Sequence, residues 1–293
     1  MGIDGSASAD RRRHAMRWFV GNADGGVRVR ARVTLVAVIL MVAIAAGCAS
    51  SQQTKQGKNA EVQSESEAGR ALERAKIHTQ LGVGYFEAGR PGVALQELNV
   101  AIEANRSYAP AYNARALVHM ELKEDAKAES DFKQALKVDP DYSAAKNNYG
   151  LFLCQRGRGE EGIRYLMDAL RNPLYETPDL AYKNAGLCAR KMGKDQEAEQ
   201  YFARALKINP DQPAAVYAMA EVHYARGDLQ AARDLMNRYM RLVPNAGAEE
   251  LWLAARLERR LGDRTAMMNY GNQLRRRFPG APETKAFLEG RFE

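Results

Sequence analysis

The fold is decided by residues 179–212, which read DLAYKNAGLCARKMGKDQEAEQYFARALKINPDQ. In this unit two small residues, Gly186 and Ala198, are followed by the bulky Phe202 and then by Pro210. The first small residue recurs at separations of 34, 34, 36, 34 and 34 residues, and its six copies are Gly82, Ala116, Gly150, Gly186, Ala220 and Ala254. A recurrence of this length predicts a repeat protein.

Three further columns share this spacing. The second small column is Ala94, Ala128, Gly162, Ala198, Ala232 and Ala266, and the bulky column is Leu98, Phe132, Leu166, Phe202, Met236 and Tyr270. Three copies end at Pro140, Pro210 and Pro244, and proline stops a helix because it lacks the amide proton. Small residues let two antiparallel helices approach closely, and the bulky side chain fills the groove that remains. The columns therefore predict helix pairs, and no strand-like alternation interrupts them.

This spacing resembles the tetratricopeptide repeat over residues 75–280. The resemblance implies an all-α, right-handed superhelical solenoid of six helix hairpins with a C-terminal capping helix. The expected repeats are 75–108, 109–142, 143–178, 179–212, 213–246 and 247–280; with a cap at 281–293, the whole domain covers 67–293. Such a solenoid presents a concave face made by the first helix of each pair, and its function is binding.

The concave face is expected to mix apolar, aromatic and amide side chains, which suits an extended peptide. Lys183 is followed four residues later by Leu187, so the Lys/Asn pattern that clamps a C-terminal carboxylate is not reproduced. The residues expected on this face are Tyr85, Phe86, Asn113, Met120, Asn147, Leu151, Leu187, Tyr217 and Tyr224. For any one of them, ordinary packing is an equally good explanation.

The N-terminal residues 1–47 are predicted to be a signal peptide. Arginines precede an apolar run at 33–46, which would span roughly 21 Å as a helix and is too short for a stable transmembrane segment. Residues 1–27 are unusually long for such a peptide and indicate an over-extended start site. Polar residues 48–66 are predicted to form a flexible tether.

The end of that run, residues 45–48 (AAGC), resembles the lipobox of bacterial lipoproteins. The resemblance implies that Cys48 becomes the first residue and carries covalent acyl chains such as palmitate. The residues after Cys48, Ala49 and Ser50, resemble the outer-membrane class of lipoproteins. The alternative is an ordinary secreted protein that is cut nearby.

Charge and motifs exclude several classes of function. The formal charge of +7 includes +4 from residues 1–47, which leaves +3 and no basic block, so no nucleic-acid partner is expected. We find no HxxxH or CxxC spacing, phosphate loop or nucleophile elbow, so we expect no metal, cofactor, small-molecule substrate or catalysis. His119 and His223 are interpreted as packing residues.

Cys154 and Cys188 lie on the first helices of adjacent repeats. The two-residue insertion between these repeats displaces Cys188 by roughly 200° around its helix relative to Cys154. Neighbouring parallel helices face each other with opposite sides, so this offset turns the two thiols toward one another. The sequence predicts a disulfide in an oxidising periplasm, and the alternative is two buried free thiols.

Specific strings extend the resemblance beyond a generic repeat. Residues 182–188 read YKNAGLC, residues 250–253 read ELWL, and residues 273–279 read QLRRRFP. With the lipid signal and six repeats, they resemble the PilF/PilW family of type IV pilus biogenesis and stability proteins. That resemblance implies a non-enzymatic outer-membrane lipoprotein on the periplasmic face, acting as a pilotin that localises the pilus secretin or supports its multimerisation.

The expected partners are thus the secretin and, through the lipid, the outer membrane. The first repeats, around Tyr85, Phe86 and Met120, are the expected secretin-binding surface because the tether places them nearest the membrane. Two alternatives remain open. One is an adaptor for peptidoglycan hydrolases or proteases, and the other is an enzyme with an unrecognised site.

Overall fold

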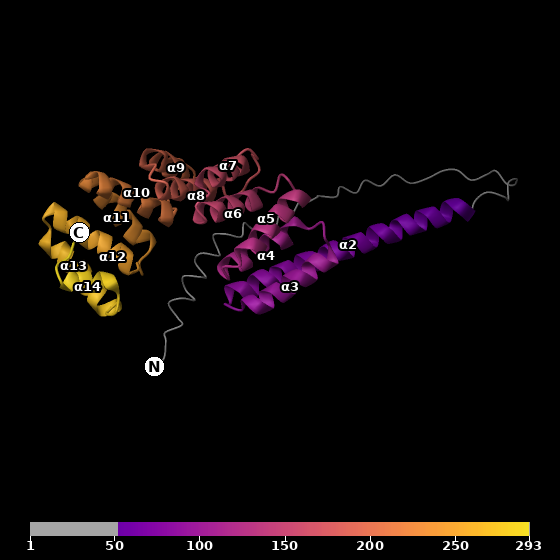
Figure 1. Ribbon diagram of the computed structural model, residues 1–293, viewed down its shortest axis with the longest axis horizontal. Helices are drawn as coiled ribbons and strands as arrows, with labels where there is room; N and C mark the ends of the chain where they lie inside the picture. The colour runs from indigo at the N-terminus through magenta and orange to yellow at the C-terminus, as the bar shows by residue number, and fades with distance from the viewer. Residues whose placement is uncertain (1–51, 293) are drawn as a thin grey trace, which may run out of the picture. The chain divides into compact units, whose positions relative to one another are not determined.

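The computed structural model describes the backbone of residues 52–292 and the side chains of residues 66–292 (Figure 1). This part of the chain contains thirteen helices and no strand, which confirms the all-α prediction. The helices are α2 (Gln52–Glu87), α3 (Pro91–Ala104), α4 (Ala109–Glu121), α5 (Asp125–Val138), α6 (Ser143–Gln155), α7 (Gly159–Ala169), α8 (Pro178–Lys191), α9 (Asp195–Ile208), α10 (Pro213–Arg226), α11 (Leu229–Leu242), α12 (Ala248–Leu261), α13 (Arg264–Arg277) and α14 (Pro282–Leu288).

The helices occur in pairs, and each predicted repeat holds one pair, from α2 with α3 to α12 with α13. A single residue with positive φ turns the chain between the two helices of each pair; Gly157 (φ 81°) does so between α6 and α7. Lys123 takes this left-handed conformation between α4 and α5, with φ of 60°. Helix α14 follows as the predicted cap.

The chain divides into two compact units, Met1–Pro140 and Asp141–Glu293. In the first unit the described helices are α2 to α5, and α2 packs against both α3 and α4. The second unit comprises α6 to α14, in which each second helix also packs against the first helix of the next pair.

Small residues bring the two helices of a pair together, as the columns predict. A Cβ atom on Gly150 would lie 2.8 Å from the carbonyl oxygen of Gly162, so α6 and α7 cross almost backbone to backbone. A Cβ atom on Gly186 would lie 2.5 Å from the ring of Phe202, which is fully buried. The bulky side chain therefore occupies the space that the small residue leaves open.

The last repeat departs from the predicted register by one residue. Ala266 and Tyr270, expected in the small and bulky columns, are only half-buried, whereas Gly271 and Leu274 are buried. Gly271 has no side chain to fill the groove. The ring of Phe287 from α14 fills it instead, and a Cβ on Gly271 would lie 1.8 Å from that ring. The cap therefore supplies the bulky group that α13 lacks.

The structure continues α2 back to Gln52, through residues expected to form part of the flexible tether. Residues 52–66 contain no proline and are rich in Gln, Lys and Glu, so their intrinsic propensity allows the helix to extend beyond its packed part. The predicted signal peptide, 1–47, and Cys48 lie outside the described residues. Among the described helices, none is both long and apolar enough to cross a membrane.

The structure contains the predicted disulfide between Cys154 of α6 and Cys188 of α8. The Cα atoms of the two residues are 5.5 Å apart, within the usual range for a disulfide. The bond joins the first helices of two adjacent repeats, so it fixes the spacing of these repeats in the second unit.

Candidate protein-binding site

The second unit has an inner face, which we define as the side of helices α6, α8, α10 and α12 that carries positions 147, 183, 217 and 252 and the positions four and seven residues after each. These first helices contact one another in turn, whereas α7, α9, α11 and α13 make no comparable contacts with each other within residues 141–292. In Figure 1, α7 and α9 lie on one side of α6 and α8. Because the pairs are closer together along their first helices, the stack curves toward those helices and makes the inner face concave.

Each of these helices carries one stripe of side chains on this face, spaced i, i+4 and i+7. The stripes run from amide and apolar residues on α6 to aromatic and arginine residues on α12. They are Asn147, Leu151 and Cys154 on α6; Lys183, Leu187 and Arg190 on α8; Tyr217, Glu221 and Tyr224 on α10; and Trp252, Arg256 and Arg259 on α12.

The structure divides the predicted binding residues into two groups. Five are half-buried and can contact a partner: Tyr85, Met120, Leu187, Tyr217 and Tyr224. Four are buried with at most 7% of their surface exposed: Phe86, Asn113, Asn147 and Leu151. The prediction that these four residues lie on an accessible surface is therefore wrong. Neighbouring helices in the stack cover positions that a single repeat would leave open.

Asn147 shows why an amide on this face is not available to a peptide. The Nδ2 of Asn184 in α8 donates a hydrogen bond to Oδ1 of Asn147, 2.9 Å away. Asn147 in turn donates from its Nδ2 to Oδ1 of Asn148, at 3.1 Å. The amide therefore joins α6 to α8 instead of facing solvent.

Lys183 is a buried cation on the inner face of α8. Burial withdraws water from its ammonium and lowers its pKa from 10.5 to about 8, although the carboxylate of Asp179 acts in the opposite direction. Asp179 is itself buried and accepts a hydrogen bond from Nδ2 of Asn209 at 3.0 Å. The charged form of Lys183 therefore opposes folding at neutral pH.

Replacing Lys183 with methionine is expected to stabilise the protein at pH 7 by up to about 3 kcal/mol. Between pH 8 and 10.5 the unfolded wild-type chain retains a proton that the folded chain has released, so its free energy of unfolding rises with pH. The Lys183→Met variant should lack this rise. Urea unfolding at pH 7 and at pH 10 measures both effects. The matched control is Lys207→Met, at an exposed helical lysine, which should keep the rise; identical pH profiles for the two variants would contradict the prediction.

The middle of the inner face is occupied by contacts within the chain. Arg190 of α8 forms an ion pair with Glu221 of α10. The ring centroid of Tyr217 lies 5.2 Å from that of Tyr239, and burial, with Glu221 nearby, raises the pKa of Tyr217. These contacts hold α8, α10 and α11 together, so this region is a structural seam.

The seam between α10 and α12 carries arginines stacked on aromatic rings. The guanidinium carbon of Arg256 lies 5.3 Å from the ring centroid of Tyr224 and 5.6 Å from that of Trp252. Arg260 lies 4.8 Å from the Tyr224 ring and donates a hydrogen bond to the Tyr224 carbonyl at 2.9 Å. Arg259 lies 4.1 Å from the ring of Phe292. We call Trp252, Arg256, Arg259, Arg260, Tyr224 and Phe292 the arginine–aromatic cluster.

Sequence reasoning placed Tyr224 on the inner face but missed the rest of this cluster. The predicted register assigns Ala254 to the small column at a spacing of 34 residues, whereas α12 begins at Ala248, 35 residues after the start of α10 at Pro213. The one-residue shift brings Trp252, Arg256 and Arg259 onto the inner face. The i, i+4, i+7 spacing of these three polar or aromatic residues was the available signal.

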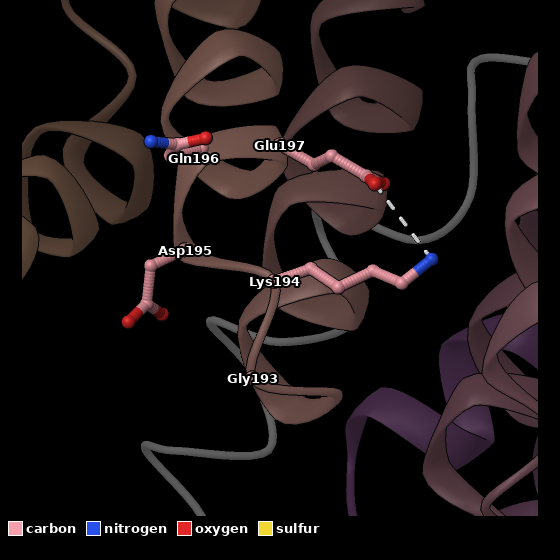
Figure 2. A pocket seen from close by; sticks show the side chains of 5 residues that line it. All are labelled: Gly193, Lys194, Asp195, Gln196 and Glu197. Atoms are coloured by element: carbon pink, nitrogen blue, oxygen red, sulfur yellow. Dashed lines mark ion pairs between the residues drawn. The ribbon is translucent and has the colours of Figure 1, made fainter.

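Figure 2 shows a surface pocket at the start of α9, lined by Gly193, Lys194, Asp195, Gln196 and Glu197. The side chain of Lys194 points toward Glu197, with Nζ and Oε1 3.7 Å apart. The Nζ of Lys194 also donates a hydrogen bond to Oε1 of Glu160 at 2.6 Å, and this bond raises the pKa of Lys194. The pocket is made from five consecutive polar or glycine residues around one turn, so it gathers no groups from distant parts of the chain.

The described residues include no group of three or more His, Cys, Asp or Glu side chains that could hold a metal ion. His119 is buried, and its Nδ1 lies 2.5 Å from Glu124. His223 is half-buried, with Nδ1 3.4 Å from Asp228. Both contacts are local, which fits the interpretation of these histidines as packing residues.

The chain is similar in sequence to tetratricopeptide-repeat proteins and to a type IV pilus assembly protein. Tetratricopeptide-repeat models match residues 109–142, 126–179 and 189–257. The type IV pilus assembly protein PilF of Pseudomonas aeruginosa PAO1 is 31% identical over 260 residues, which cover 88% of this chain and 96% of that protein.

Two solved structures agree with this relationship. The structure of PilW, described as a widely conserved type IV pilus biogenesis factor, aligns with a TM-score of 0.68 and 32% identity, over 73% of this chain and 98% of PilW. The P. aeruginosa PilF structure aligns with a TM-score of 0.69 and 31% identity, over 75% of this chain and 99% of PilF. The structure of the APC/C hetero-tetramer Cut9–Hcn1, at 16% identity and a TM-score of 0.65, shows similarity of the fold alone.

Proposed function

Because the chain belongs to the PilF/PilW family of tetratricopeptide-repeat proteins in type IV pilus biogenesis, we propose that it is a pilotin for the pilus secretin. In this proposal it is a non-enzymatic lipoprotein on the periplasmic face of the outer membrane. It localises secretin subunits there and promotes their multimerisation. The observation that carries the proposal is the similarity to PilF over 96% of that protein, which is far longer than one shared repeat.

The proposed mechanism needs an anchor and a docking surface. Acyl chains on Cys48 would hold the chain at one membrane, since each buried methylene contributes about 0.8 kcal/mol. A partner bound by the repeats would then be kept at a high effective concentration beside that membrane. In this mechanism no bond in the partner is made or broken.

The proposed secretin-binding surface lies in the first unit. Tyr85 on α2 and Met120 on α4 are the two predicted residues there that remain half-exposed. Ile77 and Leu81, spaced i, i+4 on α2, are 47% and 44% exposed and extend this apolar surface. Large apolar side chains grouped on one helix are typical of protein interfaces.

A deletion strain that expresses variants tests the proposal. Secretin multimers should co-purify with the wild type from detergent-solubilised outer membrane, and surface pili should be restored. We expect Cys48→Ser to remove the protein from the outer-membrane fraction, and Tyr85→Ala combined with Leu81→Ala to reduce secretin co-purification by at least about tenfold. The matched control is Leu174→Ala, which removes an 84% exposed leucine from the second unit and should behave as the wild type.

Other outcomes separate the alternatives. Intact pili together with altered cell shape or wall turnover would contradict the pilotin and support an adaptor for peptidoglycan hydrolases or proteases. Normal membrane fractionation of Cys48→Ser would contradict the lipid anchor.

A further inference from the structure

The arginines of the arginine–aromatic cluster differ from the arginines of the second unit that form ion pairs. Arg226 pairs with Glu199 at 2.5 Å, and Arg233 pairs with Glu258 at 2.6 Å. In contrast, Arg256, Arg259 and Arg260 have no carboxylate partner among the described residues, and aromatic rings are their side-chain neighbours.

Arg256 also has an unused donor inside the seam. Its Nε is buried and has no hydrogen-bond acceptor among the described residues. A buried donor without an acceptor destabilises the folded state, so the arrangement is not explained by stability alone. A carboxylate that draws the Arg256 side chain out of the seam would relieve this deficit.

Ring stacking prepares these guanidinium groups for carboxylates. A guanidinium lying over a ring uses its face for the ring and leaves its N–H edges free for bidentate hydrogen bonds. Arg256 and Arg259 are three residues apart on α12, which places neighbouring side chains about 5–6 Å apart. Alternate side chains of an extended chain are about 7 Å apart, a spacing that two flexible arginines can match.

We propose that the arginine–aromatic cluster binds an extended acidic segment of a partner protein. Carboxylates on alternate residues of the segment bind Arg256 and Arg259, and an apolar or aromatic side chain at the next alternate position, which points to the same side of the segment, packs on Trp252. Phe292, whose ring centroid lies 5.0 Å from that of Trp252, already shows that an aromatic side chain fits there. This surface goes beyond the proposed function, because it lies in the other unit and does not depend on which protein the first unit holds.

The surroundings favour a protein segment over a nucleic acid or a membrane. Binding along a phosphate backbone needs an extended basic track, but the adjacent stripe on α10 presents Glu221. The cluster lies in a seam on the concave side of the second unit, which a flat bilayer cannot follow.

Fluorescence anisotropy with the full-length chain in detergent tests the proposal. The probe is a fluorescein-labelled peptide in which one phenylalanine and two aspartates occupy alternate positions with glycine between them, and the reference peptide has asparagine in place of aspartate. We expect the aspartate peptide to bind more tightly than the reference, with an affinity that falls as salt increases. Arg256→Gln combined with Arg259→Gln should weaken its binding by at least about tenfold.

The matched control combines Arg264→Gln with Arg276→Gln on α13. Both arginines are exposed and contact no ring, and replacing them removes the same charge from the second unit as the test variant does. The control variant should therefore bind the aspartate peptide within about twofold of the wild type. If the double variant at Arg256 and Arg259 fails to fold by circular dichroism, the exposed Arg259→Gln alone should still weaken binding several-fold.

Three results would overturn the proposal. The first is equal binding of the aspartate and asparagine peptides, and the second is an equal loss in the test and control variants. The third is tighter binding to phosphatidylglycerol vesicles or single-stranded DNA that the same test variant abolishes. None of these results bears on secretin co-purification, so the pilotin proposal stands or fails separately.

Discussion

Replacing both Cys154 and Cys188 with serine is expected to destabilise the second unit by about 4 kcal/mol. The disulfide joins residues 34 apart in sequence, and without it the unfolded chain regains the conformational entropy of that loop. Both sulfurs are also buried, with 4% and 3% of the residue surfaces exposed, so serine hydroxyls would enter an apolar contact. Thermal unfolding followed by circular dichroism should show the midpoint falling by roughly 10 °C.

Reductant provides the matched control for this experiment. Wild-type protein unfolded in a strong thiol reductant should approach the stability of the double variant, whereas reductant should not change the melting of the variant itself. Coincident melting of wild type and variant without reductant would show that the bond contributes no stability.

Replacing Phe202 with alanine is expected to destabilise the protein by about 3–5 kcal/mol. The ring is fully buried in the cluster that also contains Leu166, Ala185 and Val222. It fills the groove beside Gly186, which has no side chain to move into the vacated space. The cavity would therefore remain open, and its lining would lose its dispersion contacts. Urea unfolding gives the change in free energy directly.

Two comparisons make the Phe202 experiment specific. Phe202→Leu keeps most of the buried volume and should cost about 1–2 kcal/mol. Leu174→Ala, at a residue that is 84% exposed, should change stability by less than about 0.5 kcal/mol. A loss for Phe202→Ala no larger than that for Leu174→Ala would contradict the role assigned to the bulky column.

The repeat spacing was enough to predict the helix pairs. Gly150 and Gly162 occupy the two small columns in the sequence, and the structure brings their backbones together at the α6–α7 crossing. The disulfide could also be derived, because the two-residue insertion shifts Cys188 around its helix by an amount that helix geometry fixes. Both features depend on the spacing of residue types along the chain, and this spacing can be read directly from the sequence.

The binding face could be predicted only in part. Asn147 and Leu151 have the correct helical position, but the adjacent helix α8 buries them. The arginine–aromatic cluster was missed because the last repeat is shifted by one residue. In the shifted register Phe287 of α14 replaces the bulky group that Gly271 lacks, and Phe287 lies outside the repeat itself.

The sequence by itself determined that this chain forms stacked helix pairs, because small, bulky and proline positions at a fixed period leave little choice of local structure. Only the tertiary structure decided which inner-face side chains remain accessible and how α12 is rotated. Accessibility and rotation depend on how neighbouring repeats share buried surface, and that is a property of contacts between segments far apart in the chain. Arg256 illustrates the difference: its sequence position is ordinary, while its stacking on Tyr224 and Trp252 exists only in the folded unit.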